Sequence, residues 1–328
     1  MAIDTAGAAT LTSSPPCITR GLPRQVTWLL ASLGFAVLLA ASLLVGVADF
    51  DRELLFISRL PRTLALVLSG SALAVSGLVM QLLTRNVFVE PSTAGTMEFA
   101  TAGLLATMML WPGAPVMVRM MAGSLAALVG AWIFLRLLAH IPLRDVLVVP
   151  LVGMMLGGVV SAATTFVAYR ADLVQGLGSW TTGDFSAVMS GRYELLWVAG
   201  LLTVVCAVVA DRFTVASLGE AFTTNLGLDH RRTMALGMTV IAVVSATVVC
   251  TVGQLPFLGL VVPNIVRRLV GDNARRTVPW VALLGAALVL VCDLVSRLVI
   301  HPFEMPIGTV MGVLGAAVFL VMLLREKK

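Results

Sequence analysis

Charged and aromatic side chains are scarce in this chain of 328 residues. Charged residues account for 12% and aromatic residues for 6%, whereas hydrophobic residues account for 59%. A soluble domain of this length needs far more polar residues to cover its surface. The composition therefore excludes a soluble globular protein. It predicts an all-α, polytopic membrane protein, because helices satisfy their own backbone hydrogen bonds in lipid.

Lysine is almost absent, since only Lys327 and Lys328 at the C-terminus are present. A Walker A loop, which binds the phosphates of ATP, requires a lysine directly after its glycines. The chain therefore has no such loop. If ATP hydrolysis drives its activity, the nucleotide must bind to another subunit.

Patterns for catalysis and for metal binding are also missing. The three histidines, His140, His230 and His301, lie near expected helix ends, and the sequence contains neither G-x-S-x-G nor H-E-x-x-H. The four cysteines are far apart, which fits neither a zinc site nor a disulfide framework. We therefore expect no enzymatic activity and no metal site in this chain.

The basic residues that are present indicate topology. The formal net charge is +5, but Lys and Arg occur in short clusters at the ends of apolar segments, which does not indicate nucleic-acid binding. With both termini in the cytoplasm, 15 of the 22 Lys and Arg residues fall on or near the cytoplasmic side. This arrangement agrees with the positive-inside rule.

About ten apolar segments are long enough, or nearly long enough, to cross a bilayer core of about 30 Å. They cover residues 26–47, 63–83, a segment ending near 110, 117–138, 146–168, 195–210, 233–252, a short or broken helix within 253–271, a helix ending near 297, and 307–324. Residues 1–25, rich in Ala, Thr, Ser and Pro, are expected to form a disordered cytoplasmic tail. Residues 26–325 then form a single transmembrane domain.

One polar and partly charged stretch, residues 216–232 (ASLGEAFTTNLGLDHRR), falls on the expected cytoplasmic side. Ser217 and Glu220 have the spacing of a capping box, in which each side chain binds a free amide at a helix start. Gly227 is well placed to end the helix. We therefore predict a short amphipathic helix within about 216–229.

The same stretch carries an apolar face. Leu218, Phe222 and Leu226 recur every four residues and share one side of a helix. A helix of two or three turns is too short to span a bilayer. The stretch is therefore either a contact for a partner protein or an ordinary solvated loop between two membrane helices, and the residues alone leave both interpretations open.

A second unusual segment follows the second apolar helix. In NVFVEPSTAGTMEFA, Pro91, Ser92 and Gly95 interrupt regular structure, and Glu98 follows them. Irregular backbone within a membrane is tolerated only when it is buried in protein or lines a cavity. Glu98 also leaves open an ion-coupled secondary transporter, since such carriers use ionisable groups within the membrane.

Four separated segments, taken in order, carry a resemblance to a known family. They are RLPRTLALVLSGSALAVSGLVMQLLTRN (59–86), LGEAFTTNLGLDHRR (218–232), GQLPFLGLVVPNIVRRLVG (253–271) and FEMPIGTVMGVLGAAVFLVMLLRE (303–326). From about residue 27 to residue 325, the chain resembles the permeases of type II ABC importers for ferric siderophores, haem and cobalamin, the FecCD-type transmembrane permeases.

The resemblance implies a ten-helix permease protomer in the bacterial cytoplasmic membrane. It would pair with a second permease, as a homodimer or a heterodimer, around a central translocation path. Two cytoplasmic ATPase subunits would bind ATP and Mg²⁺, so this chain itself would hold no cofactor. An extracytoplasmic binding protein would deliver the ferric siderophore.

By position, the resemblance also implies roles for individual residues. The segment from Ser217 to Leu228 is similar to the coupling helix, which contacts the ATPase. The other implied roles are docking of the binding protein (Arg59, Arg62 and Arg297), the cytoplasmic gate (Asn86, Pro142 and Arg144) and the wall of the path (Met154, Met155, Gly308 and Gly312). Simpler alternatives are interfacial anchoring for Arg59 and Arg62, pairing with Asp293 for Arg297, and helix packing for the rest.

One segment departs from the common family pattern. Many members have N-P-L-A-x-P-x-x-L-G after the second helix, where this chain has NVFVEPSTAGTMEFA. The variant resembles the subgroup that imports ferric siderophores, often catecholates. It points away from haem and cobalamin, which stay as the alternative substrates.

Overall fold

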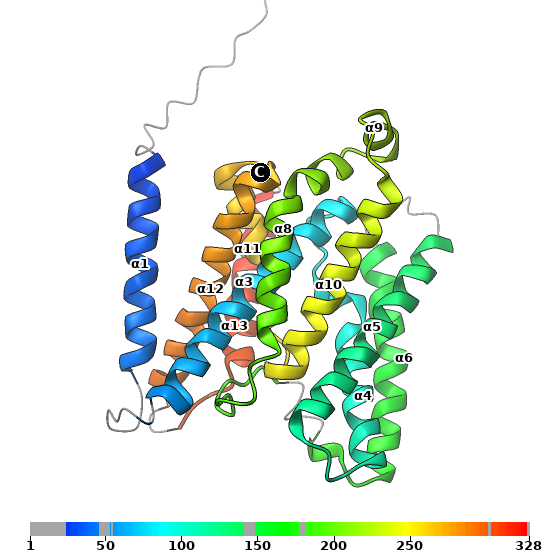
Figure 1. Ribbon diagram of the computed structural model, residues 1–328, viewed down its shortest axis with the longest axis vertical. Helices are drawn as coiled ribbons and strands as arrows, with labels where there is room; N and C mark the ends of the chain where they lie inside the picture. The colour runs from blue at the N-terminus through cyan, green and yellow to red at the C-terminus, as the bar shows by residue number, and fades with distance from the viewer. Residues whose placement is uncertain are drawn as a thin grey trace, which may run out of the picture.

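The computed structural model describes residues 24–45, 53, 55–140, 148–176, 182–300 and 303–326. Within these ranges the regular structure is helical, apart from an isolated bridge between Thr182 and Gln254. The all-α prediction is confirmed for this part of the chain (Figure 1). Of the predicted N-terminal tail, only Arg24 and Gln25 are described, and they begin the first helix.

The helices lie side by side in one bundle (Figure 1). In chain order they are α1 (Arg24–Leu44), the π-helical turn η1 (Leu55–Arg59), α3 (Leu60–Thr84), the 3-10 turn η2 (Pro91–Ala94), α4 (Thr96–Leu110), α5 (Val116–His140), α6 (Val148–Arg170), α8 (Leu196–Ala216), α9 (Glu220–Asn225), α10 (His230–Val252), α11 (Leu258–Val270), α12 (Ala274–Val299) and α13 (Ile307–Glu326).

Seven helices in the described ranges are long and apolar enough to cross a membrane, which makes the chain a multi-pass membrane protein. They are α1, α3 together with η1, α5, α6, α8, α10 and α12. The apolar helices α4 and α13 are shorter, and α11 has only 13 residues. The prediction of about ten crossings therefore stays a prediction.

The helix α3 is the centre of the bundle. Most of its residues are buried, and α8, α10, α11 and α12 pack around it. Gly70 lies against α12, where an added Cβ would be 2.8 Å from the Gly285 carbonyl oxygen, and Gly77 lies directly against Gly259 of α11. Side chains at these points would force the helices apart, so small residues set the close packing.

The helix α11 contains an internal proline, and α3 supplies the hydrogen bond that this proline cannot make. Pro263 has no backbone N–H, so the Gly259 carbonyl lacks the helical donor that it would normally receive. The Gln81 amide of α3 supplies a donor instead, at 3.3 Å. Asn264 in turn donates to the Val87 carbonyl at 2.8 Å. These bonds fasten α11 to the end of α3 and to the segment that follows it.

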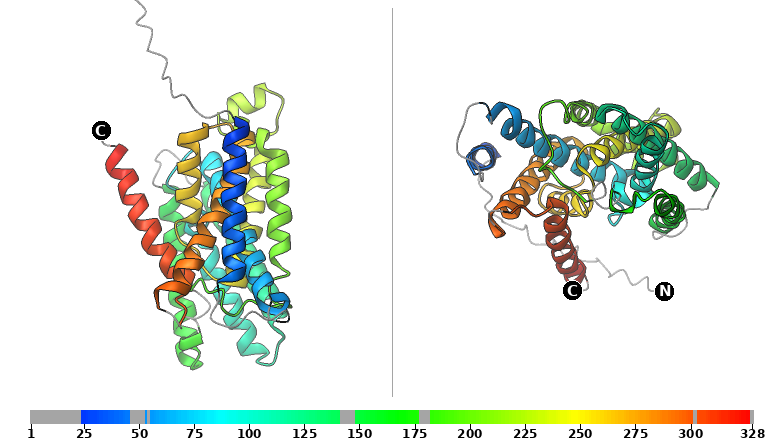
Figure 2. Two further views of the ribbon diagram at one scale, coloured as in Figure 1. Left: turned by 90° about the vertical axis from the view of Figure 1, so that its left-hand side faces the viewer. Right: turned by 90° about the horizontal axis from the view of Figure 1, so that it is seen from below.

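The helix α1 lies at the edge of the bundle (Figure 2). Trp28 stacks on Trp280 of α12 with ring centroids 3.9 Å apart, and the Ser42 hydroxyl lies 3.1 Å from that of Thr63 on α3. Much of the apolar surface of α1 is exposed, as at Leu29 and Leu33. We expect lipid or a partner to cover this surface.

The bundle has two distinct ends. The start of α1, the short helix α9 and the end of α13 lie together at one end, which we call the α9 end (Figures 1 and 2). The start of α3, which carries Arg62, lies at the opposite end, which we call the Arg62 end (Figure 1). The side of the membrane that each end faces, and the cytoplasmic location of both termini and of residues 216–229, stay predictions.

Candidate coupling helix and polar network

The helix α9 projects from the bundle between α8 and α10 (Figure 1). Leu218, Phe222 and Leu226 are exposed by 57%, 63% and 63%, and we call these three side chains the α9 face. Within the described ranges, no part of the chain buries them. An apolar surface of this kind outside the bundle is typical of a contact with another protein.

The predicted capping box of Ser217 and Glu220 is wrong. The helix α8 continues to Ala216, so Ser217 is its C-cap with helical φ and ψ of −65° and −18°. An N-cap residue normally has extended backbone. The Ser217 hydroxyl donates back to the Thr214 carbonyl at 2.6 Å, and the N-cap of α9 is Gly219, which has no side-chain cap. The short helix therefore begins at Glu220, later than predicted.

Gly227 ends α9, as predicted. It has a φ of 78°, which favours glycine. Its N–H donates to the Thr224 carbonyl at 3.0 Å, and the Leu228 N–H donates to the Thr223 carbonyl at 3.1 Å. These two bonds form a Schellman motif, which satisfies carbonyls at the helix end.

One buried side chain anchors α9 to α8. The Thr223 side chain is fully buried, and its hydroxyl donates to the Gly219 carbonyl at 2.6 Å and lies 3.3 Å from the Val215 carbonyl. The α9 face points away from this anchor because its residues are exposed. A force applied to the α9 face would therefore reach the end of α8.

The start of α9 also touches the end of α3. Gly219 has a φ of 117°, and an added Cβ would lie 2.9 Å from Nη2 of Arg85. Arg85 is the C-cap of α3 in the left-handed conformation, with φ 52°. Asn86, the predicted gate residue, follows it directly.

Gly219→Ala is expected to misplace α9. The φ of 117° costs an L-residue about 1–3 kcal/mol, and the end of the Arg85 side chain would have to shift to make room for the new Cβ. We expect a lower melting temperature in detergent and reduced transport. Gly34→Ala is the matched control, because no atom lies within 4 Å of the added Cβ and the residue is helical. Equal melting and transport for both variants would contradict the role of Gly219.

Asn86 is buried at the end of α3. Its Oδ1 accepts a hydrogen bond from the Phe88 N–H at 2.9 Å, and its own N–H donates to the Gln81 carbonyl at 3.1 Å. The side chain thus shapes the turn that leaves α3. Its role in a gate stays a prediction, and the other two predicted gate residues, Pro142 and Arg144, lie outside the described residues.

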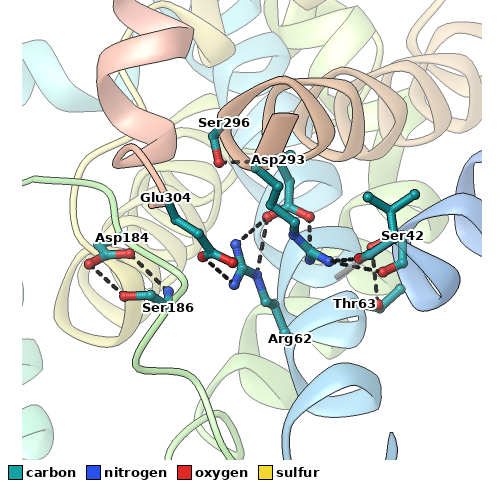
Figure 3. A network of polar contacts seen from close by, with 10 residues as sticks. Ser42, Arg62, Thr63, Asp184, Ser186, Asp293, Ser296 and Glu304 are labelled. Atoms are coloured by element: carbon teal, nitrogen blue, oxygen red, sulfur yellow. Dashed lines mark hydrogen bonds and ion pairs between the residues drawn. The ribbon is translucent and has the colours of Figure 1, made fainter. Parts of the chain in front are cut away.

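Two arginines and two carboxylates form a network at the Arg62 end (Figure 3). Arg62 pairs with Asp293 of α12 at 2.7 Å and with Glu304 at 2.7 Å. Arg297 pairs with Asp293 and donates to the Val45 carbonyl at 2.7 Å. The four charges sum to zero, and the network joins α1, α3, α12 and the link before α13.

Two of the three predicted docking arginines are buried in this network. The side chains of Arg62 and Arg297 are only 11% and 6% exposed, and both are committed to carboxylates of this chain. Pairing with Asp293, the simpler alternative for Arg297, is therefore what the structure shows. Arg59 is partly exposed and donates to the Leu43 carbonyl at 2.9 Å. Docking on any of the three stays a prediction.

The predicted path residues separate into two groups. Met154 and Met155 of α6 are exposed by 58% and 65%, as residues facing a path or a second subunit would be. Gly308 instead is buried, and its N–H donates to the Gly183 carbonyl at 2.8 Å. Its prediction as a wall residue is corrected to packing against the non-helical segment around Gly183. Gly312 is partly buried beside Pro256.

Glu98 lies in the first turn of α4, beside α6. An added Cβ on Gly157 would be 3.1 Å from the Glu98 carboxyl carbon, so glycine at this position makes room for the carboxylate. Its Oε2 has no hydrogen-bond partner among the described residues. No group of three or more His, Cys, Asp or Glu residues in the described ranges is arranged to hold a metal ion.

Two polar residues of these sites were missed in the sequence. Glu304 lies in a turn before the last helix, and its only signal was a charge at a helix end. Gln81 was one polar residue within an apolar helix, and the proline that makes it necessary is 182 positions later in the chain. Neither partnership can be recognised without the packing of α3 against α11 and α12.

Comparison with known proteins gives a consistent result. A model of the FecCD transport family matches residues 25–325. The petrobactin import system permease protein YclN of Bacillus subtilis is 42% identical over 89% of this chain and 96% of its own length. The ferric-anguibactin transport system permease protein FatD of Vibrio anguillarum is 36% identical over 90% of this chain and 98% of its own length.

A solved structure supports the fold. An inward-facing metal-chelate type ABC transporter aligns with a TM-score of 0.79 over 91% of this chain and 98% of that chain, at 23% identity. The similarity at that identity concerns the fold alone. The family match over residues 25–325 and the 42% identity to YclN show that the chain belongs to the FecCD transport family.

Proposed function

We propose that this chain is the permease subunit of a binding-protein-dependent ABC importer that carries ferric siderophore across the cytoplasmic membrane. The observation that carries the proposal is the α9 face, an exposed apolar surface at the end where both termini are expected. The substrate class is supported by relatives that are named as permeases of petrobactin import and ferric-anguibactin transport systems.

The energy for transport would come from partner subunits. The only lysines of the chain are its last two residues, so it has no Walker A loop, and ATP and Mg²⁺ would bind to two cytoplasmic ATPases. Phe222 and Leu226 would be buried in a groove of the ATPase. Thr223 and Gly219 would then pass the movement of α9 to α8 and to the end of α3, near Asn86.

A second permease would complete the path. The exposed apolar side chains of α6 and α13, including Met154, Met155 and Val321, would face it. The partner is either a second copy of this chain or a related permease. In this arrangement each protomer crosses the membrane ten times, with α4, α11 and α13 as the shorter crossings.

Uptake in a strain that lacks this permease tests the function. We expect the chain to restore uptake of radioactive iron from at least one ferric siderophore in a panel, and to leave uptake of haem and cobalamin unchanged. Glu98→Gln is expected to retain uptake, because ATP rather than an ion gradient would drive transport. Restored uptake of haem or cobalamin alone would contradict ferric siderophore as the substrate. Loss of uptake in Glu98→Gln, with no effect of changes in α9, would favour an ion-coupled carrier.

A further inference from the structure

The two carboxylates on Arg62 differ in exposure. The Asp293 side chain is 0% exposed, whereas the Glu304 side chain is 26% exposed. Asp293 accepts hydrogen bonds from both Nε and Nη2 of Arg62, and Glu304 accepts one from Nη1. An ion pair that reaches water is weakened by solvent, while a buried pair is costly to break. Glu304 is therefore the carboxylate that can leave Arg62.

Glu304 holds the link between α12 and α13. The link, residues 303–306, is also held by a 3.3 Å bond from the Met305 N–H to the Ser296 carbonyl. Two residues further on, the Gly308 N–H binds the Gly183 carbonyl. The Arg62–Glu304 pair is the one side-chain ion pair found between this link and the bundle in the described residues.

The helix that follows the link, α13, is packed on one face and exposed on the other. α13 leans away from the rest of the bundle (Figure 2), and its apolar side chains are exposed at Val313, Leu320 and Leu324. Ile307 and Met311 are buried near its start, Gly315 packs against Phe257, and Phe319 lies against Phe88 and Phe257. The link leads directly into this helix, so a change at the link acts first on the start of α13.

We propose that Glu304 is a positioning residue that occupies, on Arg62, the place taken by a carboxylate of the extracytoplasmic binding protein when it docks. The inference rests on the proposed function. Docking exchanges one carboxylate for another on Nη1 of Arg62, so the network stays neutral while Asp293 and Arg297 keep their contacts. The exchange frees the link at residues 303–306, which leads directly into α13.

Charge balance identifies the partner group. Without Glu304, Arg62 and Arg297 share Asp293 alone, which leaves one uncompensated positive charge next to a partly exposed position. A carboxylate restores neutrality, and the planar guanidinium is suited to bind it. A neutral side chain or a cation would not restore neutrality.

Hydrogen exchange on the full chain in lipid nanodiscs tests the attachment. Glu304→Gln keeps the size of the side chain and removes its charge. We expect amides of residues 303–312 to exchange at least threefold faster than in the wild type, with no change in the middle of α12. Glu304→Asp, which keeps the charge, is expected to give an intermediate rate and remains informative if the glutamine variant does not accumulate. Unchanged exchange in both variants would overturn the proposal.

An uptake assay tests the exchange of the Glu304 carboxylate for one of the binding protein. The probe is the binding protein that supports uptake in the same cells. Glu304→Gln removes the competitor, so half-maximal uptake is expected at a concentration of loaded binding protein at least threefold lower. Glu194→Gln is the control, because its carboxylate accepts from the Gly191 N–H and does not touch Arg62. An unchanged or higher half-saturating concentration for Glu304→Gln would refute the inference. Absence of wild-type uptake would instead refute the proposed function, and the hydrogen-exchange result would stand separately.

Discussion

Asp293→Ala is expected to remove most of the folded protein from the membrane. Asp293 is completely buried and pairs with both Arg62 and Arg297. Its loss leaves two guanidinium groups close together with only Glu304 to balance them. Removing one partner from a buried ion pair costs about 3–5 kcal/mol, a large part of the stability of a typical folded protein. The amount of monodisperse protein after extraction in mild detergent measures the effect.

Two further variants separate charge from packing. Asp293→Leu combined with Arg297→Leu removes the buried pair as a whole and leaves Arg62 with Glu304, so we expect a substantial recovery of monodisperse protein. Asp211→Ala breaks an exposed ion pair with Arg275 and is expected to have no measurable effect. If Asp293→Ala accumulates like the wild type, the network does not hold the bundle together.

Phe222→Asp is expected to abolish transport while the permease still folds. Phe222 is 63% exposed at the centre of the α9 face, so a charge there disturbs little within this chain. In a groove of the ATPase, however, the same carboxylate would be buried without a partner, which is strongly unfavourable. We expect uptake to fall more than tenfold, together with loss of the ATPase subunits during purification. The melting temperature of the permease alone should stay close to that of the wild type.

Thr224→Asp is the matched control for the α9 face. Thr224 is exposed in the same short helix, but it points away from Phe222, and its hydroxyl only donates to the Glu220 carbonyl. The added charge is the same. If both variants retain the ATPase and transport, the α9 face is not the contact. If both lose them, the effect belongs to the net charge of α9 and not to its apolar side chains.

Long helices could be predicted from the sequence because their signal is continuous. Apolar runs predicted the spans of α1, α3, α5, α6, α8, α10 and α12 to within a few residues at most ends. The α9 face and the glycine that ends α9 were also predicted, since helical spacing and a left-handed C-terminal residue are local properties. The fold class and the position of α9 therefore followed from short-range patterns.

Errors arose where a local pattern depended on distant contacts. The spacing of Ser217 and Glu220 fits a capping box, but α8 packs against α3 and stays helical up to Ala216, so the serine never adopts the extended backbone of an N-cap. Arg62 and Asp293 are separated by 231 positions, and only the packing of α3 on α12 brings them together. Gly308 looked like part of a smooth wall and instead supports the segment around Gly183.

The attachment of α1 has a consequence for how the protein is made. α1 leaves the ribosome before α12, and two of the residues that bind it, Trp280 and Arg297, are synthesised roughly 250 residues later. Until α12 arrives, α1 is attached through Arg59 and Thr63, which follow it closely in the chain. Its apolar surface at Leu29, Leu33 and Val37 suits that period as well as the final structure. The Ser42 and Val45 carbonyls can accept from Arg297 only after α12 has been inserted, so this part of the attachment of α1 forms late.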